Sequence, residues 1–238
     1  MVGYKNFSLC YDEIIGKRFN EVIREKFKEV SKKFKINFNE ILDLGCGTGL
    51  FLKNFYGKNI KLVGIDQSFE MLFEGKKIKD FYGICFSFPP IPIKEKFSLI
   101  VCFYDTLNHI LNSEKLRKTF KEVKNLLKEN GFFIFDTNSL LAFKRIYSNP
   151  EPYIFEMEEG RIEIKSNYFE ELLLSKVEIT GKWKDISIKD EVYEKYWSEE
   201  EIQNCLKEAG FNFIKKEKWS LGKSFDKKPY KIFWIAKV

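Results

Sequence analysis

The residues whose types and spacing most clearly suggest chemistry form a glycine-rich stretch, Gly45-Cys-Gly-Thr-Gly49. It directly follows a short apolar run, Ile41-Leu-Asp-Leu44, which predicts a strand that ends in a tight turn. Because glycine has no Cβ atom, a ligand can lie directly against the backbone of such a turn. A helix that begins after the turn offers free N–H groups and a partial positive charge. The stretch therefore predicts a site for a carboxylate or a phosphate.

Two familiar phosphate-binding motifs do not fit this turn. A dinucleotide-binding turn has the pattern G-x-G-x-x-G, and Leu50 occupies the position of its third glycine. A P-loop ends in Gly-Lys followed by Ser or Thr, and the stretch has no such ending. The remaining pattern is Asp-x-Gly-x-Gly-x-Gly, from Asp43 to Gly49, at the end of the first predicted strand.

A second carboxylate, that of Asp66, closes the next predicted strand at 61–65, and it follows Gly45 by 21 residues. At the carboxyl end of a strand, an acidic side chain can accept hydrogen bonds from both hydroxyls of a ribose. The segment that includes Ser68 can also be a helix cap, and both roles can hold together. The glycine turn and Asp66 together predict a site for an adenosine-containing ligand.

Strands and helices alternate along the first part of the chain, as in right-handed βαβ units. Almost wholly apolar runs are typical of strands that are buried on both faces of a parallel sheet. The pattern predicts an α/β fold with a doubly wound, mostly parallel sheet. The expected elements are an amphipathic helix at 16–34, strands at 41–44, 61–65, 81–86, 97–103 and 132–135, and helices at 50–55, after Ser68, and from Ser113 to Asn130-Gly131.

After Pro152 apolar and polar residues alternate, which is typical of half-exposed antiparallel strands. Residues 153–196 are therefore expected to form a small antiparallel β insertion. Ser198 and Glu201 match a capping box at the start of a helix, and Gly210 is suited to its end. Two closing strands are expected at 211–219 and 230–238.

Three segments, Ile41–Gly49, Gly64–Ser68 and Phe97–Asn108, resemble in order and spacing the motifs of class I S-adenosylmethionine-dependent methyltransferases. The resemblance is strong over about residues 36–140 and weaker from Tyr196 to Phe211. It implies S-adenosylmethionine as cofactor and a Rossmann-like, seven-stranded α/β fold. A single methyltransferase domain is then expected over 1–238, with a helical cap at 1–35 and the β insertion at 153–196.

The resemblance also implies which residues hold the cofactor. The glycine turn and Asp43 would hold its methionine end, and Asp66 its ribose. Met71 would pack near the adenine, although a core methionine on a helix face explains it almost equally well. Cys85 stands where the family often has an acid, so backbone groups or the Ser87 hydroxyl are expected to replace that contact. The expected cofactor contacts are Tyr11, Asp43, Gly45, Cys46, Gly47, Gly49, Asp66, Gln67, Met71, Cys85, Phe86, Ser87 and Phe103.

The methyl acceptor is expected at the carboxyl ends of the fourth and fifth strands, where ligands bind in such sheets. The candidates for catalysis there are His109, Asp105 and Asn108. His109 could take a proton from the acceptor, or it could be a polar residue at the start of a helix. Asp105 with Asp136 and Asn138 could instead hold a divalent cation, but a third protein ligand is not evident, so no metal is expected.

Two sets of aromatic residues have alternative roles. By the resemblance, Tyr11 could be a lid over the cofactor, and a plain core position is as good an account. The aromatics of the expected insertion could wall the acceptor pocket or form a subunit interface, which would make the protein a homodimer. They are Tyr153, Phe155, Tyr168 and Trp183.

Composition limits the function classes. The 41 basic and 35 acidic residues are mixed along the chain, which favours a solvated surface over a nucleic-acid footprint. Five cysteines without a CxxC pair, and one histidine, argue against zinc and for a reducing compartment. With neither a signal peptide nor a membrane span evident, a cytoplasmic enzyme is expected. Its function is expected to be methylation of a small-molecule nitrogen or oxygen; the alternatives are an RNA methyltransferase and a non-catalytic S-adenosylmethionine-binding protein.

Overall fold

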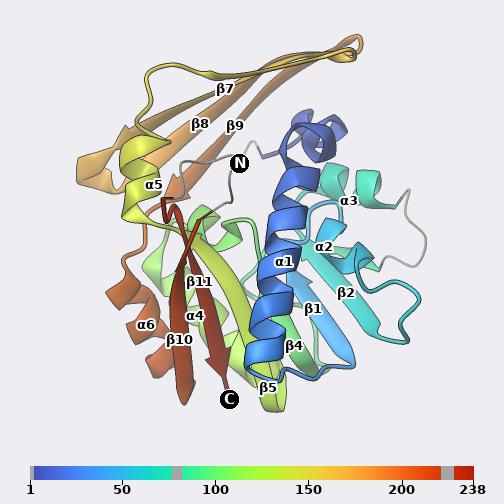
Figure 1. Cartoon of the computed structure of the whole chain (residues 1–238), viewed down its shortest axis with the longest axis vertical. Helices are drawn as coiled ribbons and strands as arrows, with labels where there is room; N and C mark the ends of the chain where they lie inside the picture. The colour runs from blue at the N-terminus through green and yellow to red at the C-terminus, as the bar shows by residue number, and fades with distance from the viewer. Residues whose placement is uncertain (1–2, 77–81, 221–227) are drawn as a thin grey trace.

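The computed structural model describes residues 3–76, 82–220 and 228–238. It consists of a seven-stranded sheet with helices on both faces and a four-stranded sheet that crosses one end of the first (Figure 1). Within the described residues, no helix combines the length and the apolar character needed to cross a bilayer.

The large sheet is parallel except for β11, which runs antiparallel to both of its neighbours. The strand after β2 continues outward as β3, whereas β4 returns to the other side of β1, so the order reverses beside β1. This arrangement confirms the doubly wound α/β fold that the sequence predicts. In spatial order the strands are β10 (Phe213–Trp219), β11 (Lys231–Lys237), β5 (Leu127–Asn138), β4 (Phe97–Cys102), β1 (Glu40–Leu44), β2 (Lys61–Asp66) and β3 (Gly83–Cys85).

Two apolar layers hold the helices to this sheet. On one face, the helices α1 (Lys17–Lys33) and α2 (Leu50–Lys53) contribute phenylalanines to the core, among them Phe27 and Phe51. On the other face, the helices α4 (Ser113–Leu126) and α6 (Glu199–Glu208) pack against each other and the sheet. The remaining helices are short: η1 (Phe7–Leu9), η2 (Asp12–Gly16), α3 (Phe69–Gly75), η3 (Thr106–His109), α5 (Leu140–Arg145) and η4 (Glu170–Leu172).

The second sheet is a continuous antiparallel meander, and it crosses the top of the molecule in Figure 1. One of its faces packs against the N-terminal segment, where Phe7, Cys10 and Ile14 form a core with residues of the sheet such as Ile162 and Trp183. The N-terminal segment is therefore held between the two sheets. The strands are β6 (Tyr153–Met157), β7 (Gly160–Phe169), β8 (Leu174–Trp183) and β9 (Ile186–Lys195).

Several elements differ in their bounds from the sequence expectation; β5 begins at Leu127 and ends at Asn138, whereas a strand at 132–135 was expected, and α2 ends at Lys53. Helix α4 ends at Leu126, before Asn130-Gly131, because Leu127 already has an extended backbone with φ −79° and ψ 140°. Strand β3 covers only Gly83–Cys85, whereas a strand at 81–86 was expected, and residue 81 lies outside the described residues.

The predicted capping box of α6 is present: the Ser198 hydroxyl accepts the N–H of Glu201, whose carboxylate accepts the N–H of Ser198. We expect Ser198→Ala to lower the free energy of unfolding by about 1 kcal/mol, because the first turn of α6 loses a hydrogen-bond acceptor. Thermal denaturation should show a melting temperature lower by roughly 2–4 °C. Ser187→Ala, at an exposed position of β9, is the control, and an equal loss there would contradict the assignment.

Candidate functional site

The glycine turn lies over the carboxyl end of β2. The N–H groups of Gly45 and Cys46 both donate to the carbonyl oxygen of Ile65, at 2.7 and 3.0 Å. Gly45 has a φ of +74°, and a Cβ atom on it would lie 2.3 Å from Cγ2 of Thr106. Glycine is required here both by the left-handed backbone and by the packing of the following loop.

Asp66 is hydrogen-bonded directly to the turn. Its Oδ2 atom accepts the N–H of Gly47 at 2.8 Å, and its Oδ1 atom accepts the N–H of Ser68 at 2.8 Å. Burial raises the pKa of Asp66, and the bonds to Ser68 and Gly47 oppose that shift. The turn and the carboxylate therefore face the same space.

A cavity of about 750 Å³ opens beside the turn and Asp66, a volume suited to a nucleoside-sized ligand. Its walls come from the glycine turn, the start of α3, the loop after β4, the N-terminal segment and β9. Tyr4, Tyr11 and His109 lie on the side toward β9, and Met71 and Ser87 belong to the side toward α3 and β3. A larger hollow of about 930 Å³, lined by residues such as Phe55 and Ile84, has neither the turn nor a strand-end aspartate in its wall, so we assign it no chemistry.

Asp43 is buried beneath the turn, with 2% of its surface exposed. Burial, and then the negative charge of Asp66, raise the pKa of Asp43 to about 8. The carboxyl group is therefore largely neutral near neutral pH. A cationic group bound above the turn would favour its ionised form.

Lys231, at the start of β11, occupies the space between two acidic strand ends. Its Nζ atom lies 2.6 Å from Oδ1 of Asp105 and 3.0 Å from Oδ2 of Asp136, and only 3% of its surface is exposed. Burial alone would raise the pKa of Asp105, but the charge of Lys231 holds it below its usual range. For Asp136 burial prevails, and its pKa is raised. The buried ammonium of Lys231 thus supplies the positive charge that a divalent cation between Asp105 and Asp136, the alternative considered from the sequence, would have supplied.

Glu194, near the end of β9, reaches the same cluster from the second sheet. Its Oε2 atom accepts hydrogen bonds from the Tyr147 hydroxyl at 2.7 Å and from the Asn138 amide at 2.8 Å. The same amide donates to Oδ2 of Asp105 at 3.0 Å. Burial, and then the charge of Asp105, raise the pKa of Glu194 well above its usual value.

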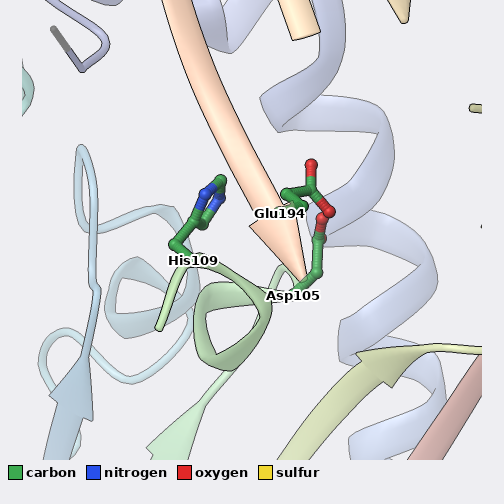
Figure 2. Close-up of side chains that lie close together, drawn as sticks. All are labelled: Asp105, His109 and Glu194. Atoms are coloured by element: carbon green, nitrogen blue, oxygen red, sulfur yellow. The ribbon is translucent and has the colours of Figure 1, made fainter. Parts of the chain in front are cut away.

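Asp105, His109 and Glu194 form a cluster of titratable side chains (Figure 2). One potential ligand atom from each lies within 4.8 Å of the others, a spacing that a metal ion could use. Because Lys231 already neutralises Asp105 and Glu194 carries a raised pKa, we assign no metal to this cluster.

The residues expected to take part in catalysis therefore differ in their surroundings. The Nδ1 atom of His109 lies 3.0 Å from the Tyr193 carbonyl oxygen, and its ring lies edge-on to Tyr4 beside the cavity. Asn108 is fully buried; its amide donates to the Lys195 carbonyl and its oxygen accepts the N–H of Asn138. Both ends of the Asn108 side chain are thus used to join the two sheets, which removes it as a catalytic candidate.

Several of the residues expected to contact the cofactor are not among the described residues that line the cavity. Phe103 is fully buried and packs against Phe51 and Phe233, so it is a core residue. Cys85 and Phe86 are exposed and are not among the described residues that line the cavity, whereas Ser87 is. Of the expected set, the residues that line the cavity are Tyr11, Gly45, Cys46, Gly47, Asp66, Gln67, Met71 and Ser87.

The four aromatic residues that the sequence suggested for the acceptor wall are not among the described residues that line the cavity. Trp183 is buried in the core with the N-terminal segment, and Phe155 packs against that core. Tyr168 lies against Phe143, and Tyr153 is 43% exposed. The wall on this side comes instead from Val192 and Tyr193 of β9.

Sequence reasoning missed Lys231, Glu194 and Tyr147. A signal for Glu194 was present, because it shares strand parity with the apolar residues Ile188 and Val192 and therefore points inward. A charged residue at a core-facing position of a strand is uncommon and indicates a partner. Nothing local to Lys231 identifies its partners, which precede it by 126 and 95 residues.

The sequence matches a protein family described as a methyltransferase domain over residues 15–216. A protein of Geobacillus sp. (strain WCH70), provisionally named a methyltransferase, is 25% identical over 155 residues, which are 61% of this chain and 62% of that protein. The chain thus spans less than two thirds of this relative.

Solved structures share the fold. An S-adenosylmethionine-dependent methyltransferase from Clostridium acetobutylicum is 27% identical, with a TM-score of 0.79 over 98% of both chains. An S-adenosylmethionine-bound amino pentose methyltransferase from Micromonospora echinaspora is 13% identical, with a TM-score of 0.74 over 100% of this chain and 99% of that one. At 13% identity the second likeness concerns the fold alone.

The raised pKa of Asp43 gives a pH-dependent stability. Between about pH 4 and pH 8 the folded state binds this proton and the unfolded state does not, so Asp43 destabilises the fold progressively as the pH rises. We expect Asp43→Asn to remove this contribution. In denaturant titrations without ligand, the variant should gain stability relative to the wild type from pH 5 to pH 8, by at most about 1.4 kcal/mol per pH unit. A difference that is constant over this range would contradict the buried, protonated carboxyl group.

Proposed function

This chain belongs to the methyltransferase-domain family, and from that premise we propose that it transfers the methyl group of S-adenosylmethionine to a nitrogen or oxygen atom of a small molecule. The observation that carries the proposal is the hydrogen bond between Asp66 and the N–H of Gly47, because it joins the glycine turn and the ribose-binding acid in one cavity.

The residues around the cavity suit the proposed cofactor. Asp66 offers carboxylate oxygens for ribose hydroxyls, and the turn can approach a ligand closely because a Cβ atom is absent at Gly47. Met71 belongs to the wall at the start of α3, where an adenine would lie. In its ionised form, the carboxyl group of Asp43 beneath the turn can attract a positively charged amino group of the ligand. When bound, S-adenosylmethionine would supply an activated methyl group on a sulfonium.

A small acceptor is supported by the charge of the cavity. Four of its described lining residues carry a formal charge, and they are balanced: Lys5 and Lys115 against Asp66 and Glu70. An RNA substrate would need a continuous basic surface that leads into the site. The amino pentose methyltransferase that shares this fold is consistent with a small acceptor.

The chain's own residues would align the acceptor and exclude water. Tyr4 and Tyr11, which contact each other edge-on, form the wall between the N-terminal segment and the cavity. Their faces can attract a cationic sulfur, and their position can shield the reaction from solvent. His109 and Asp105 lie on the acceptor side, where a proton would be removed. The rate would then depend mainly on the alignment of acceptor, methyl carbon and sulfur.

We expect S-adenosylmethionine and S-adenosylhomocysteine to raise the melting temperature at saturating concentration, because they bind only the folded state. Asp66→Ala should abolish the shift while the variant remains folded. Asp185→Ala, at an exposed aspartate, should keep it. If neither ligand shifts a folded, ligand-free wild type, the proposed function fails.

The acceptor class can be found by a methyl-transfer screen with labelled S-adenosylmethionine against small amines, hydroxy compounds and transfer RNA. We expect label on a small molecule. Label on RNA alone would support the alternative substrate, and tight cofactor binding without transfer to any class would favour a non-catalytic binding protein.

A further inference from the structure

One carboxyl oxygen of Glu194, on β9, lies within 4.8 Å of one of Asp105, in the loop after β4. A single amide, that of Asn138, donates to both: 2.8 Å to Glu194 and 3.0 Å to Asp105. Two adjacent carboxylates cannot both be ionised at low cost, so such a pair binds one proton between them. Glu194 is 4% exposed and the Asp105 side chain is 18% exposed, which leaves Asp105 as the member nearer to solvent, and its chain neighbours Tyr104 and Thr106 line the cavity.

We propose that Glu194 and Asp105 form a proton-sharing pair that accepts the proton of the methyl acceptor. Lys231 is the positioning residue that keeps one member of the pair ionised. The methyl acceptor is an amine. This inference rests on the proposed function.

Lys231 determines which carboxyl group of the pair is ionised. Its Nζ atom contacts Oδ1 of Asp105 at 2.6 Å, while Glu194 is bonded to the neutral donors Tyr147 and Asn138. The negative charge therefore resides on Asp105 and the proton on Glu194. These directions agree with the lowered pKa of Asp105, where Lys231 outweighs burial, and the raised pKa of Glu194, where burial is the main cause.

The pair is surrounded by groups that could change its charge. Tyr4 faces it from the N-terminal segment, and burial, then the charge of Glu194, raise the pKa of its hydroxyl. His109 faces Asp105 from η3, and Asp136 faces Lys231 from β5. Among the described residues, the charged and titratable groups around the pair include Tyr4, Tyr11, His109, Asp136, Tyr147 and Lys231.

The chemistry of the pair favours an amine over a hydroxyl acceptor. A carboxylate is far too weak a base to ionise an aliphatic hydroxyl, but it can take the proton of an ammonium group whose pKa lies closer to its own. Lys231 is already paired with Asp105 and Asp136, so its charge is not available to an anionic acceptor. The faces of Tyr4 and Tyr11 can in addition attract an ammonium group.

The proposed step balances in atoms and charge. An acceptor ammonium gives one proton to the ionised pair and becomes a neutral amine. The nitrogen lone pair then forms the N–CH3 bond, the S–CH3 bond breaks, and its electrons remain on sulfur in S-adenosylhomocysteine. The product leaves as a methylated ammonium ion, and the pair releases its extra proton to solvent.

The pair can be tested without a substrate by ¹³C NMR of glutamate labelled at its side-chain carboxyl carbon. We expect the Glu194 resonance, assigned by its loss in Glu194→Gln, to show the protonated form at pH 7. In Asp105→Asn the midpoint of this titration should move down by at least one pH unit, because the neighbouring negative charge is gone. An ordinary glutamate titration in both proteins would overturn the pair.

The catalytic part is tested with the amine panel. Asp105→Asn should lower kcat/KM for the best amine by roughly 10²–10⁴-fold, the usual contribution of a general base, because Asp105 carries the negative charge of the pair. The shift of melting temperature by S-adenosylhomocysteine should be unchanged. Asp185→Asn, the same substitution at an exposed aspartate, is the matched control and should retain full activity. Loss of activity in His109→Gln but not in Asp105→Asn would assign the base to His109 and overturn the proposal.

The test of the positioning role of Lys231 requires a charge-balanced variant, because Lys231→Met alone leaves two buried carboxylates without a cation. Lys231→Met/Asp136→Asn removes one charge of each sign. We expect it to fold and to shift the acidic limb of the kcat/KM profile upward by at least one pH unit, because Asp105 loses its cation. Lys231→Arg should keep the wild-type limb. A lower rate with an unmoved pH profile in the double variant would indicate a purely structural lysine and overturn this role.

Failure of this inference can be distinguished from failure of the proposed function. A wild type that binds the cofactor but methylates only hydroxy compounds, or no member of the panel, overturns the amine assignment and leaves cofactor binding intact. A protein that binds neither S-adenosylmethionine nor its product fails the proposed function, whatever the state of the pair.

Discussion

Four neighbouring parallel strands of this protein bring an aspartate to the same edge of one sheet, and the mutual repulsion of these aspartates must be relieved. The structure uses three means for the four aspartates. Asp43 is neutral near pH 7 because burial raises its pKa to about 8. Asp66 accepts two backbone N–H groups. Asp105 and Asp136 share the buried ammonium of Lys231. The site divides accordingly into a cofactor side and an acceptor side.

The N-terminal segment and the second sheet complete this edge, and each is held through a polar contact. Oδ2 of Asp190, on β9, accepts the N–H of Phe7 at 2.7 Å, and the Thr48 hydroxyl donates to Asp12 at 2.6 Å. The first bond joins the segment to the second sheet, and the other joins it to the glycine turn. Tyr4 and Tyr11 are thereby fixed between the cofactor cavity and the acidic pair.

Local patterns predicted the fold well. Apolar runs, the glycine turn and the capping box each encode one element, and a parallel sheet forces the strand-end aspartates to meet. The residues on the acceptor side were harder to predict from the sequence. Glu194 and Lys231 reach this side from strands far along the chain, and their positions depend on the order of strands in both sheets. Phe103 shows the opposite error: its position after a strand suggested a ligand contact, yet its side chain completes an aromatic core.

The most direct test of the account is a crystal structure of the complex with S-adenosylhomocysteine. The account predicts that both ribose hydroxyls lie within hydrogen-bond distance of the Asp66 carboxylate, with the homocysteine against the glycine turn. The sulfur should point toward Tyr4 and the Asp105–Glu194 pair. A ligand whose ribose lies away from Asp66, or whose sulfur faces α3 instead of the acidic pair, would contradict the proposed division of the site.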